Sequence, residues 1–168
     1  MVKSREHRPV VLVADDDEPT RFVVASTLAQ ENFDVVEAAN GQEALEHFAE
    51  LQPDIVLLDV EMPVMDGHTA CLRIRRSDAG HDVPIVMVTG HDDSESINRA
   101  YGLGATDFIS KPIHWPLLGH RLRYILRGAR NYQALGVSEA ENRALLAAMP
   151  DSIFVVDEGG SILTHLDE

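Results

Sequence analysis

Short apolar runs alternate along the chain with segments of helical pattern. Five runs rich in β-branched residues are each too short for a helix, and their composition is typical of strands. They cover residues 10–13, 35–36, 55–58, 85–88 and 108–109. Several are apolar at every position, which indicates strands covered on both faces, as in a parallel sheet between two layers of helices.

Helices are predicted between the strands from apolar residues that recur every three or four positions, over 19–32, 41–51, 68–76 and 94–101. Their apolar positions include Phe22, Val24, Leu28, Ala44, Leu45, Phe48, Leu51, Cys71, Ile74, Ile97, Ala100 and Tyr101. Repeats of strand and helix with right-handed crossovers predict an α/β fold. We expect a doubly wound, five-stranded parallel sheet of order 2-1-3-4-5 with helices on both faces.

A further helix is expected to start near His114 and to extend beyond the sheet domain. Its apolar seam advances by steps of four and three through Leu118, Leu122, Ile125, Ala129 and Tyr132. The seam fits either docking on the domain as core or pairing with a second copy as a short coiled coil, and we favour pairing. The arginines of this helix are expected to face solvent, namely Arg121, Arg123, Arg127 and Arg130.

The pattern changes again near the C-terminus. Gly136 is expected to break the long helix, and Ser138 with Glu141 predicts a capping box that starts a second helix ending at Met149. Residues 152–163 then read as strand, turn and strand, which predicts a β-hairpin. The predicted organisation is a tail (1–8), a sheet domain (9–127), a helical linker (128–150) and a hairpin segment (151–168).

Composition narrows the classes of function. The 168 residues carry a net charge of −14, which disfavours binding of nucleic acid or anionic membranes by this segment and favours metal ions and cationic partners. Cys71 is the only cysteine, so no internal disulfide can form, which fits a reducing cytoplasm. No apolar run suits a signal peptide or reaches the roughly 20 residues of a membrane span. A cytoplasmic protein is expected.

Polar residues stand where the predicted strands end. Three aspartates at 15–17 follow the first strand, Asp59 ends the third, Thr89 ends the fourth, and Lys111 follows the fifth. The carboxyl ends of parallel strands share one edge of the sheet, where ligands of such folds bind. Carboxylates gathered there repel by about 4 kcal/mol per close pair, so a hard divalent cation such as Mg²⁺ is expected. Lys111 is suited to bind a phosphate group as a point charge.

These motifs together resemble the receiver domain of bacterial response regulators, the phosphoproteins of two-component signalling. The motifs are the acidic run at 15–17, Asp59 within the segment 58–67, Thr89 with Gly90, and Lys111 with Pro112. Each motif is weak alone, but four in the right order on the right strands are specific. The resemblance covers about residues 9–127 and implies a flavodoxin-like receiver fold with a regulatory rather than an enzymatic role.

The resemblance also implies a role for each residue of the site. Asp59 is implied to be the phosphoacceptor, taking the phosphoryl group from a phosphohistidine of a sensor histidine kinase or a phosphotransfer protein. Asp16 is implied to bind Mg²⁺ directly, and Asp15 to help hold it, partly through water. The Glu61 backbone carbonyl is implied to be a further metal ligand.

The switch residues follow from the same resemblance. Lys111 is implied to pair with a phosphoryl oxygen, and the Thr89 hydroxyl to move toward the phosphoryl group. Phe108, at the family's rotating aromatic position, would then turn from exposed to buried. Because Phe108 has no hydroxyl, only packing can bias its rotamers. The Glu61 and His91 side chains are candidates for modulating hydrolysis of the phosphoaspartate.

Residues 142–166 resemble the opening of a PAS sensory domain, cut short before a ligand-binding core. The resemblance implies that the receiver switches the output of a downstream domain absent from this chain. Two alternatives stand beside this interpretation. One is a Mg²⁺-dependent phosphohydrolase of similar fold with an aspartyl-phosphate intermediate, for which Asp15 and Asp17 have the right spacing. The other is a receiver-like interaction module that is not phosphorylated.

Overall fold

A single parallel sheet forms the centre of the larger part of the molecule. The computed structural model describes residues 8–90, 101–147, 153–156 and 162–166, with side chains described over 8–90 and 101–131. The five strands of the sheet lie in the order β2-β1-β3-β4-β5, as predicted. They are β1 (Val10–Ala14), β2 (Asp34–Ala38), β3 (Ile55–Asp59), β4 (Ile85–Thr89) and β5 (Asp107–Ser110).

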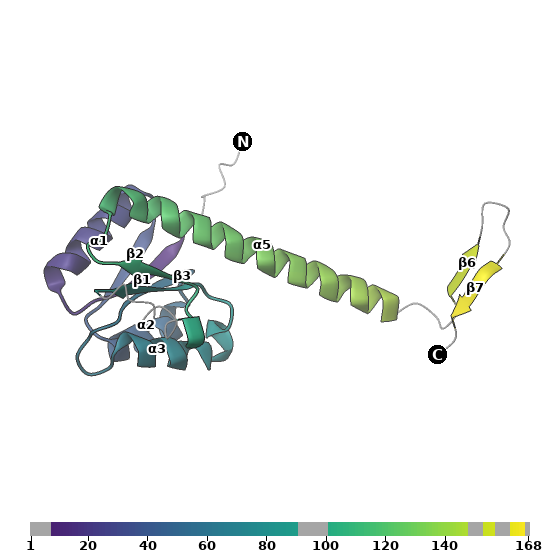
Figure 1. The fold of residues 1–168 in the computed structure, drawn as a ribbon, viewed down its shortest axis with the longest axis horizontal. Coiled ribbons are helices and arrows are strands. Elements are labelled where there is room, and N and C mark those ends of the chain that lie inside the picture. The colour runs from purple at the N-terminus through teal and green to yellow at the C-terminus, as the bar shows by residue number, and fades with distance from the viewer. Residues whose placement is uncertain (1–7, 91–100, 148–152, 157–161, 167–168) are drawn as a thin grey trace. The chain divides into compact units, whose positions relative to one another are not determined.

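Helices cover both faces of this sheet. They are α1 (Glu18–Gln30), α2 (Gly41–Leu51), α3 (Gly67–Arg75), the short 3-10 helix η1 (Asp78–Gly80) and α5 (Trp115–Ala147). In Figure 1, α2 and α3 lie on one face of the sheet, while α1 and the first turns of α5 lie on the other. The helix predicted over 94–101 falls almost entirely on residues 91–100, which lie outside the described residues.

Three helices begin with a polar cap directly after a strand or its loop. The side chains of Asp17, Asn40 and Asp66 accept hydrogen bonds from the first-turn amides of α1, α2 and α3, respectively. Such caps satisfy amide groups that have no partner inside a helix, and each contributes about 1 kcal/mol. Short polar sequences thereby fix where each helix starts relative to the carboxyl end of the strand before it.

Two apolar cores flank the sheet. One contains Leu12, Leu58, Met87, Phe48 and Ile74, which join the sheet to α2 and α3. The other is built from Val13, Leu57, Val86, Leu28, Phe33, Leu118, Leu122 and Leu126, which join it to α1 and α5. Burying each large side chain contributes about 1.5–3 kcal/mol, so the strands that carry the site are held on both faces.

Some predicted stripe residues prove to be exposed. Phe22 is 69% exposed, Leu51 50% and Tyr101 46%, whereas Val24, Ala44, Phe48, Cys71 and Ile74 are buried as expected. Helical spacing identifies residues on a common side of a helix but not the width of the buried strip. Phe22 precedes Val24 by two positions, a rotation of about 200° around the helix, so it lies on the side of α1 away from the buried strip.

Helix α5 also differs from its prediction. Leu118 and Leu122 are 2% and 0% exposed and pack in the core, so they do not serve pairing with a second copy. Arg121, Arg127 and Arg130 are exposed as expected, and Arg121 also forms an ion pair with Asp107. Arg123 is half-buried and forms an ion pair with Glu31.

The C-terminal part of the chain continues this helix. The compact units are Met1–Ala129 and Arg130–Glu168, and α5 runs without a break to Ala147. The predicted break at Gly136 and the cap at Ser138 are therefore wrong, because one glycine costs a helix only about 1 kcal/mol. The predicted hairpin is present as antiparallel β6 (Ile153–Val156) and β7 (Ile162–Leu166). Within the described residues, no helix has the length and apolar character of a membrane span.

Candidate functional site

The site lies where four neighbouring strands end. Ala14 of β1 lies opposite Leu58 of β3, Asp59 opposite Val88 of β4, and Thr89 opposite Ser110 of β5. This register brings the residues that follow β1, end β3 and β4, and follow β5 to one edge of the sheet. The sequence-based expectation that these strand ends share one location is confirmed.

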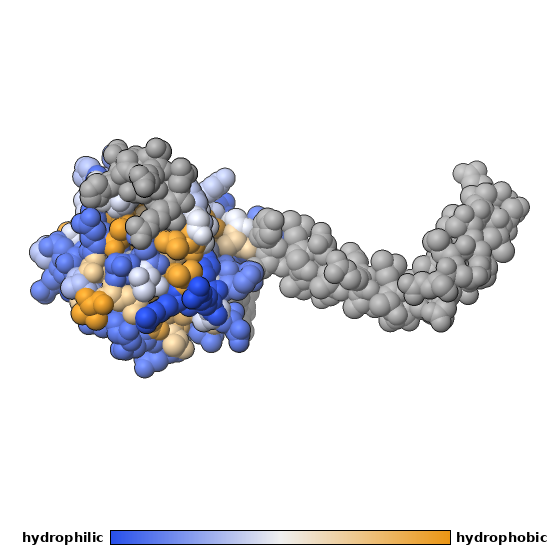
Figure 2. All heavy atoms as spheres, turned by 60° about the horizontal axis from the view of Figure 1, so that its bottom comes forward, coloured by the Kyte–Doolittle hydropathy of each residue, from blue (hydrophilic) through white to orange (hydrophobic). Residues whose placement is uncertain are grey.

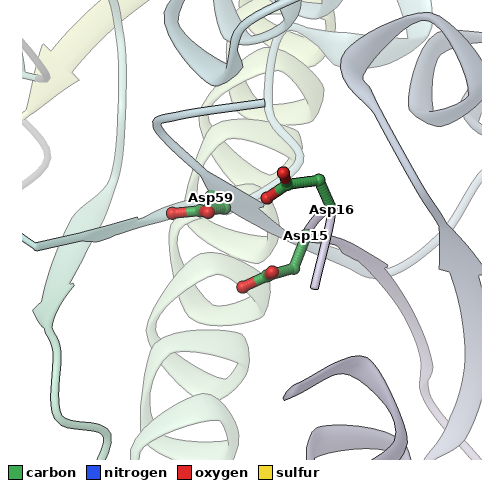
Figure 3. Close-up of side chains that lie close together, drawn as sticks. All are labelled: Asp15, Asp16 and Asp59. Atoms are coloured by element: carbon green, nitrogen blue, oxygen red, sulfur yellow. The ribbon is translucent and has the colours of Figure 1, made fainter. Parts of the chain in front are cut away.

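Three carboxylates form the centre of this edge. One oxygen each from Asp15, Asp16 and Asp59 lies within 4.8 Å of the others. Asp15 and Asp59 are buried, at 4% and 5% exposure, while Asp16 is exposed. Figure 3 shows the three side chains lying close together, two from the segment after β1 and one from β3. Groups 43 positions apart in sequence thus share one small volume.

The Lys111 ammonium group faces the buried pair. Its Nζ atom lies 3.1 Å from Asp15 Oδ2 and 3.0 Å from Asp59 Oδ2. Burial raises the pKa of Asp59 and the charge of Asp15 raises it further, while the Lys111 hydrogen bond only partly offsets this. Burial alone would lower the pKa of Lys111, but its bonds to Asp59 and Asp15 raise it overall. Lys111 therefore remains protonated between two carboxylates.

The charge balance and donor set fit Mg²⁺. Three carboxylates against one ammonium group leave two negative charges at the site, which a divalent cation would neutralise. All the acidic donors are oxygen atoms, which Mg²⁺ prefers, and one face of the cluster is open at exposed Asp16. The raised pKa of Asp59 shows that Lys111 alone does not compensate for the buried charge. The cluster can therefore hold a hard cation.

Asp17 has a different role from Asp15 and Asp16. Its side chain caps α1, accepting from the Thr20 amide at 2.9 Å and from the Thr20 hydroxyl at 2.6 Å. These hydrogen bonds lower the pKa of Asp17. The acidic run thus divides between one capping residue and two residues of the carboxylate cluster.

Close backbone packing fixes the loop after Asp59. A Cβ atom on Gly67 would lie 2.0 Å from the Asp59 carbonyl oxygen, so only glycine allows α3 to start against the end of β3. The Gly67 amide donates to the Val60 carbonyl at 3.0 Å. Val64, at the tip of this loop, has a φ angle of 66° and is 84% exposed. The loop is therefore held tightly at its ends next to Asp59.

The remaining predicted residues of the site are Thr89, Phe108, Glu61 and His91. Thr89 is buried, at 5% exposure, and its carbonyl accepts from the Lys111 amide at 2.7 Å. Phe108 is half-buried, with its ring edge-to-face to that of Tyr101 at a centroid distance of 6.0 Å. Glu61 has an exposed side chain two positions after Asp59. His91 lies outside the described residues.

One contact of the site was missed from the sequence. Arg21 Nη1 donates to the backbone carbonyl of Asp15 at 2.7 Å. A bond to a main-chain oxygen demands no particular partner side chain, so residue types alone do not reveal it. The only available signal is the position of an arginine one turn into the helix that follows the acidic run.

A family model for the response regulator receiver domain matches residues 11–123. Among curated proteins, the DNA-binding dual master transcriptional regulator RpaA of Synechocystis sp. is 33% identical over 95% of this chain and 67% of its own length. The sensory transduction protein BceR of Halalkalibacterium halodurans is 32% identical over 73% of this chain and 52% of its own length. The chain spans about half to two thirds of the length of the curated relatives it matches.

Solved structures give the same result for the fold. The chemotaxis response regulator CheY4 of Vibrio cholerae superposes with a TM-score of 0.68 at 30% identity, covering 70% of this chain and 98% of that chain. A CheY-like receiver domain protein from Methanospirillum hungatei, at 22% identity, superposes with a TM-score of 0.70 over 74% of this chain and 98% of its own. The flavodoxin-like receiver fold expected from the sequence is confirmed.

Proposed function

The chain belongs to the response regulator receiver family, a regulatory part of two-component signalling, and from this premise we propose that Asp59 is its phosphoacceptor. The observation that carries the proposal is the meeting of three carboxylates and one ammonium group at the carboxyl edge of the sheet. Asp59 combines burial, a direct bond to Lys111 and a neighbouring acidic pair.

Asp15, Asp16 and Asp59 would hold Mg²⁺, with the backbone carbonyl of Glu61 as a further oxygen ligand. The bound ion would supply charge neutralisation for the phosphoryl oxygens. Asp16 is the exposed member of the cluster and is open to the solvent side from which an ion arrives. Asp15 keeps its place through Lys111 and the Asp17 amide, which donates to Asp15 Oδ1 at 2.9 Å.

The transfer step needs only the carboxylate of Asp59 as nucleophile. One Asp59 oxygen forms a bond to phosphorus while the bond between phosphorus and the imidazole nitrogen of the donor breaks, and that nitrogen keeps the electron pair. Lys111 lies 3.0 Å from Asp59 Oδ2 and is placed to pair with a phosphoryl oxygen as the charge moves onto this residue. The donor is a phosphohistidine of a sensor histidine kinase or a phosphotransfer protein.

The switch would use Thr89 and Phe108. Thr89 ends the strand beside Asp59, and its hydroxyl can move to bond the phosphoryl group. Phe108 is half-buried beside Tyr101, so an inward turn would change this contact and the surface of β5. The change would be passed to a downstream domain absent from this chain.

We propose the same division of the whole chain as the sequence suggests: a tail at 1–8, the receiver at 9–127, a linker at 128–150 and the start of a PAS-like domain at 151–168. The boundary of the compact units between Ala129 and Arg130 and the hairpin of β6 and β7 support this division without identifying the downstream domain. A homodimer through the extension of α5 remains part of the proposal, as does a cytoplasmic location.

The proposal is tested by labelling with acetyl phosphate, a small-molecule phosphodonor. We expect one phosphoryl group per chain by intact-protein mass spectrometry with Mg²⁺, and none with EDTA. Asp59→Asn should remove the label, while the control Asp78→Asn, an exposed residue of η1, should keep it. Labelling that persists in Asp59→Asn would overturn the assignment of the phosphoacceptor.

The same assay separates the two alternatives. Catalytic turnover of phosphate esters through Asp15 would indicate the phosphohydrolase, and the absence of both labelling and turnover would indicate an interaction module. In the hydrolase alternative, Asp17 would be the second carboxyl group and would act as an acid at the reacting phosphate. Its hydrogen bonds to Thr20, which cap α1, count against this role.

A further inference from the structure

The guanidinium group of Arg21 lies directly beside the backbone of the acidic cluster. Arg21 belongs to α1, and its Nη1 atom donates to the Asp15 carbonyl at 2.7 Å. Its Nε atom lies 3.6 Å from Glu37 Oε2 on β2, and the side chain is only 14% exposed. A largely buried cation is thus held between one main-chain oxygen and one carboxylate, and its loss of hydration must be offset by these two contacts.

The two neighbouring aspartates are supported very differently. The Asp15 carboxylate accepts from the Asp17 amide at 2.9 Å and from Lys111 at 3.1 Å. For Asp16, no hydrogen bond or ion pair reaches the carboxylate from residues 8–90 or 101–131. Its oxygen nevertheless lies within 4.8 Å of those of Asp15 and Asp59. The direction of the Asp16 side chain therefore depends on the backbone to which it is attached.

That backbone is held at two points. The Asp15 amide donates to the Ala38 carbonyl of β2 at 3.2 Å, and the Asp15 carbonyl, which belongs to the peptide bond leading into Asp16, accepts from Arg21. Rotation of this peptide would swing the Asp16 side chain away from Asp59. Arg21 is the only side chain in the described part of the chain shown to bond this carbonyl.

We propose that Arg21 is a positioning residue for metal binding, which holds the peptide between Asp15 and Asp16 so that the Asp16 carboxylate faces that of Asp59. Glu37 assists by holding the guanidinium group and offsetting its charge. The inference rests on the proposed function, since the cation concerned is the Mg²⁺ of the receiver site. Groups that orient metal ligands typically change metal affinity by about 10–100-fold.

Electrostatics and positioning predict opposite effects when Arg21 is replaced. Removing a positive charge near the site should strengthen Mg²⁺ binding if charge alone matters. Loss of the bond to the Asp15 carbonyl should weaken it. Arg21→Met keeps much of the buried aliphatic stem and removes every donor, so it separates the two effects with little loss of packing.

The experiment is a titration of the chain with Mg²⁺ in the absence of a phosphodonor. Binding is measured by isothermal titration calorimetry and by the shifts of backbone amide signals in NMR spectra. We expect the Kd for Mg²⁺ to rise about tenfold in Arg21→Met. The control Arg127→Met removes the same charge from an exposed position on α5 and should leave the Kd within about twofold of wild type. Adding Glu37→Gln to Arg21→Met should weaken binding no further, because Glu37 acts through Arg21.

An unchanged or lower Kd in Arg21→Met would overturn the inference. Absence of saturable Mg²⁺ binding by the wild-type chain would overturn the proposed metal site instead, so the two failures are distinguishable. The NMR spectra also report whether the variant is folded. If Arg21→Met does not fold, Arg21→Gln, whose side chain is too short to reach the carbonyl, replaces it with the same expected rise in Kd.

Discussion

Asp59 and Asp15 are buried side by side, with one ammonium group between them. Burial and the charge of Asp15 raise the pKa of Asp59, so its ionised form weakens the metal-free folded state. Asp59→Asn removes this charge and keeps the shape. We expect it to raise the free energy of unfolding by about 1–2 kcal/mol at neutral pH in EDTA, as measured by urea denaturation.

The pH dependence of this effect has a defined sign. Because the pKa of Asp59 is raised in the folded state, the stability gained by its protonation is present below the unfolded pKa of about 4. It is lost as the pH rises through the folded pKa. The difference in free energy of unfolding between Asp59→Asn and wild type should therefore vanish in acid and grow as the pH rises toward neutral. Saturating Mg²⁺ should reduce or reverse it, and a destabilised variant in EDTA would contradict this prediction.

The sequence located the charged residues of the site better than their supports. Asp15, Asp59 and Lys111 stand at strand ends, where topology alone brings them together. Arg21 carries no such signal, because its partner is a main-chain carbonyl whose direction depends on the folded loop. Asp17 caps α1, whereas Asp15 and Asp16 lie in the carboxylate cluster, and three consecutive acidic residues do not by themselves reveal this division.

The start of α3 against the end of β3 leads to a prediction about the loop that carries Asp59. A Cβ atom at position 67 would meet the Asp59 carbonyl oxygen at 2.0 Å and the Met87 side chain at 3.2 Å. Backbone cannot move aside as a flexible side chain can. Gly67→Ala is therefore expected to lower the free energy of unfolding by about 2–3 kcal/mol and to weaken Mg²⁺ binding by displacing Asp59. Denaturation and the Mg²⁺ titration measure the two effects.

Gly128→Ala is the matched control for that substitution. Nothing lies within 4 Å of a Cβ atom at this position, which is exposed and helical. Alanine favours a helix interior over glycine by about 0.5–1 kcal/mol, so this variant should be slightly more stable and bind Mg²⁺ normally. Equal effects of Gly67→Ala and Gly128→Ala on stability and Mg²⁺ binding would show that the close contact with the Asp59 carbonyl is not the reason for glycine at position 67.

The helices and strands differ in how well the sequence predicts them. The strands of a buried parallel sheet are apolar at nearly every position, as in β3 and β4, and half-exposed strands or surface helices do not produce such runs. The exposed faces of α1 and α2 were harder to predict. Leu51 lies three positions after the buried Phe48 and is nevertheless exposed, and the exposed Phe22 is an apolar residue away from the buried strip of α1. The continuity of α5 through Gly136 was missed because a local propensity of about 1 kcal/mol does not decide the end of a long helix.

The described members of both apolar cores lie within the first compact unit. Their buried members extend from Val11 to Leu126, and the unit ends at Ala129. The surface that this unit presents in Figure 2 is mainly hydrophilic, with apolar areas lying among polar ones. The acidic site and its supports also lie within these residues. Folding and phosphorylation are thus expected to be properties of this unit alone.

A chain cut after Asn131 tests this expectation and the proposed dimer together. The cut removes no described core residue, so the free energy of unfolding should change by no more than about 0.5 kcal/mol, and labelling of Asp59 should be retained. Leu118 and Leu122 are buried and cannot pair with a second copy, so we expect pairing to use the helix beyond Ala129. Sedimentation should therefore give a dimer for the full chain and a monomer for the shortened one. A monomeric full chain would exclude pairing through α5, and a dimeric shortened chain would place the interface on the receiver itself.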